Sequence, residues 1–188
     1  MKPEHRIALL DTGTARARGK ALGLDEQLAT LNVFRTLLHQ ESVAKAVAGT
    51  LTTLLFTGNR LDVRLRELVI MRIGWRRGSC YEWTQHWRVA RGLDIPEHDL
   101  LAVRDWRSAR CFSALERAGL TATDETLDDG HISKRTWSRC AKLLPADQQV
   151  ELVIAIGNWI MFSQLLKSLA VPLEDGVAPW PPDGLVPA

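Results

Sequence analysis

Apolar residues recur at three- and four-residue steps along most of this chain, which is the spacing of one face of an α-helix. The pattern runs from Asp25 to Leu38 and resumes between Ser42 and about Phe56. No run of alternating apolar and polar residues, which would indicate a β-strand, stands out in the sequence. The pattern therefore predicts an all-α fold, a single domain of about six to eight helices.

Polar residues and glycines mark the ends of the helices predicted in the middle of the chain. Asp62 is suited to cap the start of a helix that ends near Gly78, and a dense apolar run predicts that this helix is largely buried. Ser79 opens the next helix, which ends near Gly92. Glu82 follows Ser79 at the spacing of a capping box, in which the two side chains bond backbone N–H groups at the helix start.

Four more helices are predicted in the second half of the chain, the first of them opened by Pro96. The next covers about residues 108–127, where Gly119 costs about 1 kcal/mol and allows a break. Ser133 caps a short helix, and the longest runs from about Val150 to Leu169. Apolar residues surround most of that last helix, so we expect its own domain or another subunit to cover it.

The two ends of the chain lack a helical period. Residues 1–24 alternate basic, small and glycine residues, and we expect them to form an N-terminal arm that is poorly ordered. Residues 171–188 hold five of the eight prolines and are expected to form a Pro-rich tail, either an extended strap or a disordered end. The predicted helical domain is the part between them, residues 25–170.

Charge and cysteine content narrow the class of protein. Lys and Arg (24) nearly balance Asp and Glu (22), so the net charge of +2 does not indicate nucleic acid or an anionic membrane as a partner. No stretch approaches the ~20 apolar residues of a membrane helix. Cys80, Cys111 and Cys140 are odd in number and widely spaced, which suits a reducing compartment, and we expect the last two in the core. We therefore expect a cytoplasmic protein that acts on a small molecule.

The segment from Glu67 to His86 contains the residues best suited to chemistry. Glu82 and His86 are four residues apart, so they share one helix face, where the carboxylate can orient the imidazole. A return of the chain through Gly78 would bring Glu67 beside them, and burial is expected to raise the pKa of Glu67. Two carboxyl groups beside an imidazole have coupled titrations, so one group can donate a proton while another accepts one near neutral pH.

Each of these residues also has a structural interpretation. Glu82 could complete the capping box begun by Ser79, and Glu67 could pair with one of the nearby arginines. A lone helical histidine such as His86 is more often structural than catalytic. Tryptophans at helical spacing are more often core than pocket walls, a choice that applies to Trp75, Trp83 and Trp87. Spacing alone does not decide between the two interpretations.

Two neighbouring motifs resemble those of a known family. The run Arg66–Ile70, followed by Tyr-Glu-Trp-x-x-His at 81–86, resembles the carboxymuconolactone decarboxylase family of the alkylhydroperoxidase D-like superfamily, over roughly residues 28–175. The resemblance implies an alkylhydroperoxidase D-like helical bundle, a site that needs no cofactor and no metal, and a homo-oligomer, often a trimer or hexamer. In the alkylhydroperoxidase D branch a Cys-x-x-Cys pair carries the redox chemistry, and its two positions fall here on Ser79 and Glu82. A dithiol mechanism at those positions is therefore excluded.

The decarboxylase branch implies a carboxy-lyase that acts by proton transfer on a small unsaturated lactone or acid. The residues that would carry catalysis are Glu67, Glu82 and His86, and those that would contact substrate are Ser79, Tyr81 and Trp83. One or two arginines could bind a substrate carboxylate, from a set that comprises Arg60, Arg64, Arg66, Arg72, Arg76, Arg77, Arg88 and Arg91.

Three alternatives remain open at this level. Cys80 lies near a predicted helix N-terminus, where the dipole would favour the thiolate, so a peroxidase that uses a single thiol is one alternative. A non-catalytic protein that keeps the fold and binds a ligand is the second. The third is an arginine-rich face for nucleic acid, which the interspersed acids Asp62 and Asp94 disfavour.

Overall fold

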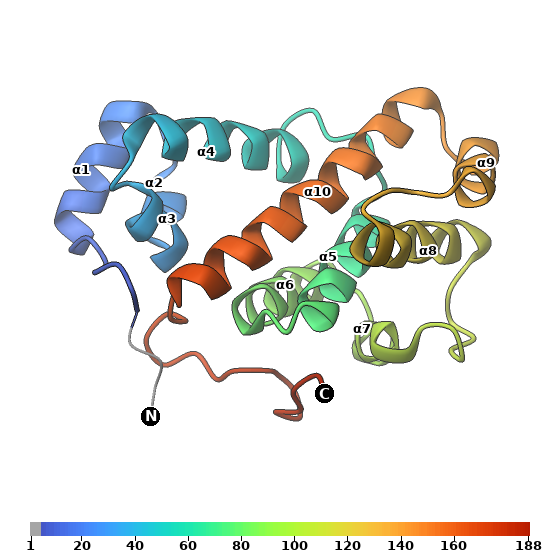
Figure 1. Cartoon of the computed structure of the whole chain (residues 1–188). Helices are drawn as coiled ribbons and strands as arrows, with labels where there is room; N and C mark the ends of the chain where they lie inside the picture. The colour runs from blue at the N-terminus through green and yellow to red at the C-terminus, as the bar shows by residue number, and fades with distance from the viewer. Residues whose placement is uncertain (1–4) are drawn as a thin grey trace. The chain divides into compact units, whose positions relative to one another are not determined.

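The computed structural model describes residues 5–188, and over that range it contains helices and no β-strand (Figure 1). The helices are α1 (Thr12–Leu22), α2 (Glu26–Thr30), α3 (Asn32–Leu37), α4 (Glu41–Leu55), α5 (Val63–Arg76), α6 (Cys80–Gly92), α7 (Glu97–Ala102), the 3-10 helix η1 (Val103–Asp105), α8 (Ala114–Asp129), α9 (Lys134–Leu143) and α10 (Ala146–Leu169). Within the described range seven α-helices have ten or more residues, which confirms the predicted all-α class and helix number.

Contacts within the chain divide it into two compact units. Unit 1 contains the residues up to Asn59 together with Leu165–Val177, and so includes α1 to α4 and the end of α10. Unit 2 contains Arg60–Gln164 and Ala178–Ala188, and so includes α5 to α9 and most of α10. Every residue that the sequence proposed for catalysis or substrate contact lies in unit 2.

In unit 1, α1 lies inside the segment 1–24, which was expected to form an arm. Residues 1–4 of that segment lie outside the described range. The side chain of Asp11 caps the start of α1 by accepting from the Thr14 N–H, and Gly23 ends it with a left-handed backbone. A Cβ on Gly19 would lie 2.5 Å from the Ala29 side chain of α2, so small residues allow the two helices to touch. A contact built on small residues has no apolar period, which is why the pattern missed this helix.

The helix predicted from Asp25 to Leu38 is two helices, because Leu31 has an extended backbone and separates α2 from α3. The Asn32 side chain, at the start of α3, donates to the carbonyls of Pro172 and Leu173. The first part of the Pro-rich tail therefore lies along unit 1.

In unit 2, α5 packs against both α6 and α8. All of its residues from Leu65 to Gly74 are buried, and Asp62 accepts from the Leu65 N–H, as predicted for its cap. A Cβ on Gly74 would lie 3.1 Å from the backbone nitrogen of Trp83, which shows how closely α5 and α6 approach. Because α5 and α6 pack this closely, polar side chains of α5 can reach polar side chains of α6.

Helix α8 starts later than predicted and does not break at Gly119. The capping box is formed by Ser113 and Glu116, so the helix begins at Ala114 and residues 108–113 are not helical. A Cβ on Gly119 would lie 2.7 Å from Cδ1 of Leu65. The glycine therefore permits close packing on α5, and tertiary contact outweighs its cost in helix propensity.

Helix α10 begins directly after Pro145, four residues before the predicted start. By length and composition alone it could cross a membrane, contrary to the expectation from the sequence, although buried core helices pass the same test. Leu152, Ile156 and Trp159 are almost fully buried, while Val150 and Ile154 are at least half exposed. The single chain thus covers one side of this helix only, which is less than the apolar pattern led us to expect.

Candidate active site

The Gly78 turn folds α6 back onto α5 and brings Glu67, Glu82 and His86 together. Gly78 has a positive φ of 59°, a conformation that glycine adopts without strain. Nδ1 of His86 lies 2.7 Å from Oε2 of Glu67, and Nε2 of His86 lies 3.7 Å from Oε2 of Glu82. All three side chains are buried, with relative exposures of 0% for Glu67, 5% for Glu82 and 8% for His86.

Glu67 is the charged member of this group. Burial raises the pKa of Glu67, but the interactions with His86 and Arg66 outweigh burial, and the net pKa is lowered. Arg66 contributes through an ion pair in which its Nε lies 3.0 Å from Oε1 of Glu67. The expectation that the pKa of Glu67 would be raised is therefore wrong, because the sequence could not show that His86 and Arg66 both bond this carboxylate.

Glu82 is the carboxyl group whose pKa is raised. Burial raises its pKa to about 7, and the Glu67 charge adds to this, while His86 opposes it. The capping-box interpretation is wrong, because α6 has no side-chain hydrogen bond at its Ser79 cap. Both Ser79 Oγ and Glu82 Oε2 are buried without a hydrogen-bond partner in the described part of the chain. Buried polar atoms without partners are rare in folded proteins and often mark functional sites.

The indole of Trp159, on α10, completes the surroundings of His86. Its Nε1–H donates to Nε2 of His86 at 2.9 Å, and the two rings meet edge to face. An indole N–H can only donate, so Nε2 must accept. The proton of the neutral imidazole therefore lies on Nδ1 and is donated to Glu67, whose carboxylate also orients the ring.

The pKa of His86 reflects opposing influences. Burial lowers the pKa of His86, but the charge and hydrogen bond of Glu67 raise it by more. The net pKa is therefore raised. The second proton would have to enter at Nε2, where it would displace the Trp159 N–H and face Glu82.

Cys80 does not have the environment expected of a reactive thiol. Burial raises its pKa, and the hydrogen bonds of Thr84 and of the Trp180 backbone only partly oppose this. Its Sγ lies 3.8 Å from Oγ1 of Thr84, which also accepts from the Trp180 backbone N–H at 3.2 Å. The net pKa of the thiol is raised, so the expectation of a lowered thiol pKa is wrong. Of the other cysteines, Cys140 is buried as predicted, but Cys111 is exposed.

Residues 178–188, which we call the C-terminal strap, pack against the N-terminal half of α6. Nε1 of Trp83 donates to the Pro181 carbonyl at 2.8 Å, and Asp183 accepts two hydrogen bonds from Arg104 at 2.7 and 2.9 Å. Trp180 is almost fully buried and has a left-handed backbone with φ of 54°. Specific packing must offset that unfavourable conformation. These contacts favour the extended strap over the disordered end.

Trp83 belongs to an aromatic core. Its ring stacks on Trp87 and also contacts Trp75 and Trp180. The Arg104 guanidinium lies over the rings of Trp75 and Trp83, at 4.5 and 4.9 Å from their centroids. Because the indole N–H of Trp83 is already used by the strap, the structure gives it no free polar group for a substrate. Tyr81, the other aromatic residue proposed to contact substrate, is buried on α6.

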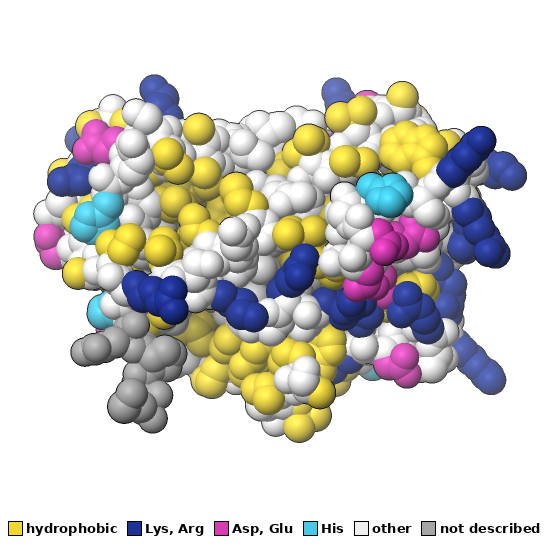
Figure 2. All heavy atoms as spheres, in the orientation of Figure 1, with side chains coloured by type: hydrophobic (Ala, Val, Ile, Leu, Met, Phe, Trp, Pro, Cys, Tyr) yellow, Lys and Arg dark blue, Asp and Glu magenta, His cyan; other side chains and the backbone are white. Residues whose placement is uncertain are grey.

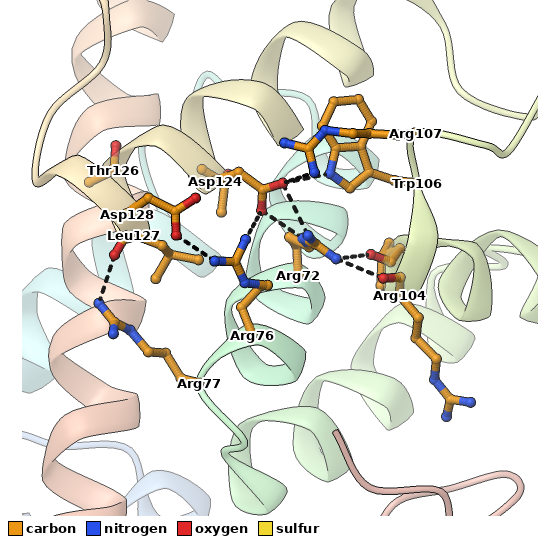
Figure 3. Close-up of polar contacts among 12 residues, drawn as sticks. Arg72, Arg76, Arg77, Arg104, Trp106, Arg107, Asp124, Thr126, Leu127 and Asp128 are labelled. Carbon is orange, nitrogen blue, oxygen red and sulfur yellow. Dashed lines mark hydrogen bonds and ion pairs between the residues drawn. The ribbon is translucent and has the colours of Figure 1, made fainter. Parts of the chain in front are cut away.

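Figure 3 shows that two of the candidate substrate-binding arginines, Arg72 and Arg76, are already paired with Asp124 of α8. Arg72 donates to both carboxylate oxygens, at 2.7 and 3.0 Å, while Arg76 lies at 3.2 Å and Arg107 at 3.0 Å. The Trp106 indole N–H donates to the same carboxylate. This cluster joins α5, α8 and the segment after α7, so its role is to hold the bundle.

The remaining arginines divide between ion pairs and the surface. Arg64 pairs with Asp99 at 2.8 Å and with Glu116 at 2.6 Å. The exposed members of the candidate set are Arg60, Arg76, Arg77, Arg88 and Arg91. On the face seen in Figure 2, dark blue basic side chains are dispersed, with magenta acidic side chains among them. Within residues 5–188 no group of three or more His, Cys, Asp or Glu residues is arranged to hold a metal ion.

Sequence reasoning missed two residues that shape this site, Trp159 and Trp180. Both are tryptophans whose partners are far along the chain, 73 residues away for Trp159 and 96 for Trp180. The only signal in the sequence is an indole N–H that must find a partner when it is buried.

Comparison with known proteins identifies a family region within the chain. Residues 41–125 match the model described as the Carboxymuconolactone decarboxylase family, a range that contains Glu67, Glu82 and His86. No curated protein sequence matches this chain.

Several solved structures share the fold at low sequence identity. A peroxidase-related protein of Silicibacter sp. TM1040 has a TM-score of 0.75 at 14% identity, with 94% of this chain and 96% of that chain covered. An alkylhydroperoxidase AhpD core, peroxidase-related, of Ralstonia eutropha JMP134 has a TM-score of 0.74 at 14% identity, with 96% and 100% covered. A variant of the debrominase Bmp8 in complex with 2,3,4-tribromopyrrole has a TM-score of 0.75 at 14% identity, with 93% and 95% covered. These likenesses show the alkylhydroperoxidase D-like fold.

Proposed function

We propose that this chain, whose residues 41–125 match the carboxymuconolactone decarboxylase family, is a cofactor-free enzyme that transfers protons on a small unsaturated lactone or acid. The observation that carries this proposal is Glu82. Its carboxyl group is buried, its Oε2 has no hydrogen-bond partner and lies 3.7 Å from an imidazole nitrogen, and its pKa is raised to about 7. A carboxylic acid that stays protonated near neutral pH is suited to general acid catalysis.

The decarboxylation we propose needs one proton. The bond between the substrate carbon and its carboxylate breaks, the electron pair enters the conjugated carbonyl, and carbon dioxide leaves. Glu82 then delivers its proton to the carbon of the resulting enolate and regains one from solvent. General acid catalysis of this kind contributes roughly 10² to 10⁴-fold. An isomerisation of the double bond would use the same groups, with one abstracting and one returning a proton.

His86 and Glu67 support that acid. Nε2 of His86 lies 3.7 Å from Glu82, so it can take up a proton from Glu82 or return one once the Trp159 N–H is displaced from it. Glu67, with its lowered pKa, stabilises the imidazolium that forms. Whether Glu82 or His86 donates the proton depends on which of the two holds it in the resting enzyme.

The proposal is tested with a panel of unsaturated lactones and acids, by carbon dioxide release and by deuterium incorporation from D₂O. We expect Glu82→Gln and His86→Ala each to reduce turnover by at least ~100-fold while circular dichroism shows a folded protein. Glu97, exposed on α7, provides the matched control, and Glu97→Gln should keep full turnover. Normal turnover in both site variants would overturn the proposal.

Peroxidase activity at Cys80 is the alternative that the fold comparisons keep in view, since two of the similar structures are described as peroxidase-related. The buried thiol, with its raised pKa, counts against it. Peroxide consumption with a thiol donor tests this alternative, and a rate that falls on Cys80→Ser would support it. A ligand that stabilises the protein in a thermal-shift screen and is recovered unaltered would instead indicate a non-catalytic binding protein.

The cellular location is part of the same proposal. All three cysteines are free in the structure, as expected for a reducing compartment. We therefore keep the cytoplasm as the expected location, to be checked by cell fractionation.

A further inference from the structure

The hydrogen bond from Trp159 to His86 has a consequence for where protons reside. Nε1–H of Trp159 donates to Nε2 of His86 at 2.9 Å, and Trp159 is 1% exposed, so water does not compete for this bond. Nδ1 on the opposite side of the ring is bonded to Glu67 at 2.7 Å. Both ring nitrogens are thus engaged, and only one tautomer of the neutral ring satisfies both hydrogen bonds.

We propose that Trp159 is a positioning residue that holds His86 as the neutral Nδ1–H tautomer and thereby keeps the mobile proton of the site on Glu82. An imidazolium would place an N–H at Nε2, directly opposite the indole N–H. Two donors facing each other in a buried site are unfavourable, since each loses its acceptor. Trp159 therefore opposes protonation of His86 and favours the carboxylic acid form of Glu82.

The groups around His86 are consistent with this assignment. Glu67 of α5 and Glu82 of α6 both favour the imidazolium, and Arg66 of α5 opposes it. Trp159 is the residue of α10 that bonds the ring. The carboxylates alone would draw a second proton to His86, and the indole N–H is the feature that prevents this at rest.

The inference about catalysis rests on the proposed function, but the resting protein tests it without any substrate. Two-dimensional ¹⁵N NMR of the imidazole rings distinguishes the two neutral tautomers from the imidazolium. The chain has five histidines, so the His86 signals are assigned by their loss in His86→Gln. At pH 7 we expect the neutral Nδ1–H pattern for His86. An Nε2–H tautomer or an imidazolium in the wild-type protein would overturn the proposal.

Trp159→Phe removes the N–H and keeps an aromatic ring. We expect the pKa of His86 to rise by roughly 0.5 to 1, the size that corresponds to one hydrogen bond. Trp137, an exposed tryptophan on α9, provides the control, and Trp137→Phe should leave the His86 titration unchanged. A folded Trp159→Phe protein with an unchanged His86 titration would also contradict the proposal.

The pH dependence of turnover distinguishes a positioning role of Trp159 from a purely structural one. In Trp159→Phe the acid limb of the kcat pH profile should move upward with the pKa of His86. If Trp159→Phe fails to fold, the tautomer of the wild-type protein still decides the question. If the enzyme proves inactive on every substrate tried, the proposed function fails while the tautomer assignment stands or falls by NMR.

Discussion

Glu82 and His86 lie one turn apart on α6, with Oε2 and Nε2 separated by 3.7 Å and no hydrogen bond between them. That distance is roughly 1 Å longer than a hydrogen bond between such atoms. A proton can pass directly only after a small side-chain movement, or through a ligand atom that bridges them. The resting geometry therefore keeps acid and base apart until something enters or moves.

The raised pKa of Glu82 predicts a pH-dependent stability difference. A carboxyl whose folded pKa is raised from 4.5 to about 7 stabilises the fold below its unfolded pKa, and this contribution is lost as pH rises through 7. Glu82→Gln cannot ionise, so we expect it to be more stable than wild type at pH 8, by up to about 3 kcal/mol. The difference should shrink toward pH 5. Urea unfolding at both pH values measures it, and a difference independent of pH would contradict it.

Removing Glu67 should cost stability. Glu67→Ala leaves Arg66 and His86 buried without their carboxylate partner, a change expected to destabilise the fold by about 3 to 5 kcal/mol. Because the pKa of Glu67 is lowered, its contribution is present above the unfolded pKa and is lost as pH falls through the folded pKa. Unfolding by urea at pH 7 measures the effect. Glu97→Ala, on the surface of α7, should change stability by less than about 0.5 kcal/mol.

The Asp124 cluster predicts a sharp contrast between two neighbouring aspartates of α8. Asp124→Asn should destabilise the protein by about 3 to 5 kcal/mol, because Arg72 would lose its bidentate partner in a buried site. Asp128→Asn should cost at most about 1 kcal/mol, since the Asp128 side chain is 52% exposed. Thermal or urea unfolding of both variants provides the comparison. Similar losses in the two would mean that the cluster contributes little.

The C-terminal strap should protect Cys80. Deleting residues 178–188 removes the Trp180 N–H that bonds Thr84, and with it the buried indole ring of Trp180. We expect faster labelling of Cys80 by a disulfide reagent in the truncated protein, measured in a Cys111→Ser background because Cys111 is exposed. Arg104→Ala, which breaks the pair with Asp183, should give an intermediate rate. Equal labelling rates in all three proteins would show that the strap does not cover the thiol.

The exposed apolar residues of α10 predict self-association. Val150, Ile154 and Met161 lie on this helix within unit 2 and are 64%, 50% and 39% exposed. Their exposure is consistent with the trimer or hexamer expected from the sequence, which stays a prediction. Light scattering should show an assembly larger than a monomer, and Ile154→Asp should reduce its size. Lys142→Asp, a charge change on α9, is the control.

The sequence alone determined which residues form helices wherever a cap and an apolar period coincide. Asp62 and the apolar run of α5 identified that helix and its burial correctly, and the Glu82 to His86 spacing placed both on one face. These features are local, because they depend on hydrogen bonds and side-chain neighbours within a few residues. The α1 helix escaped the pattern, since its contact with α2 depends on Gly19 and not on an apolar stripe.

Only the tertiary structure decided the protonation of the site. Whether Glu67 or Glu82 holds the proton depends on Arg66 and His86 as neighbours of Glu67 and on the burial of Glu82. The tautomer of His86 depends on Trp159, which lies 73 residues away along the chain. Electrostatic energies in a buried site vary with distances of a few ångströms, and these distances are set by how helices pack.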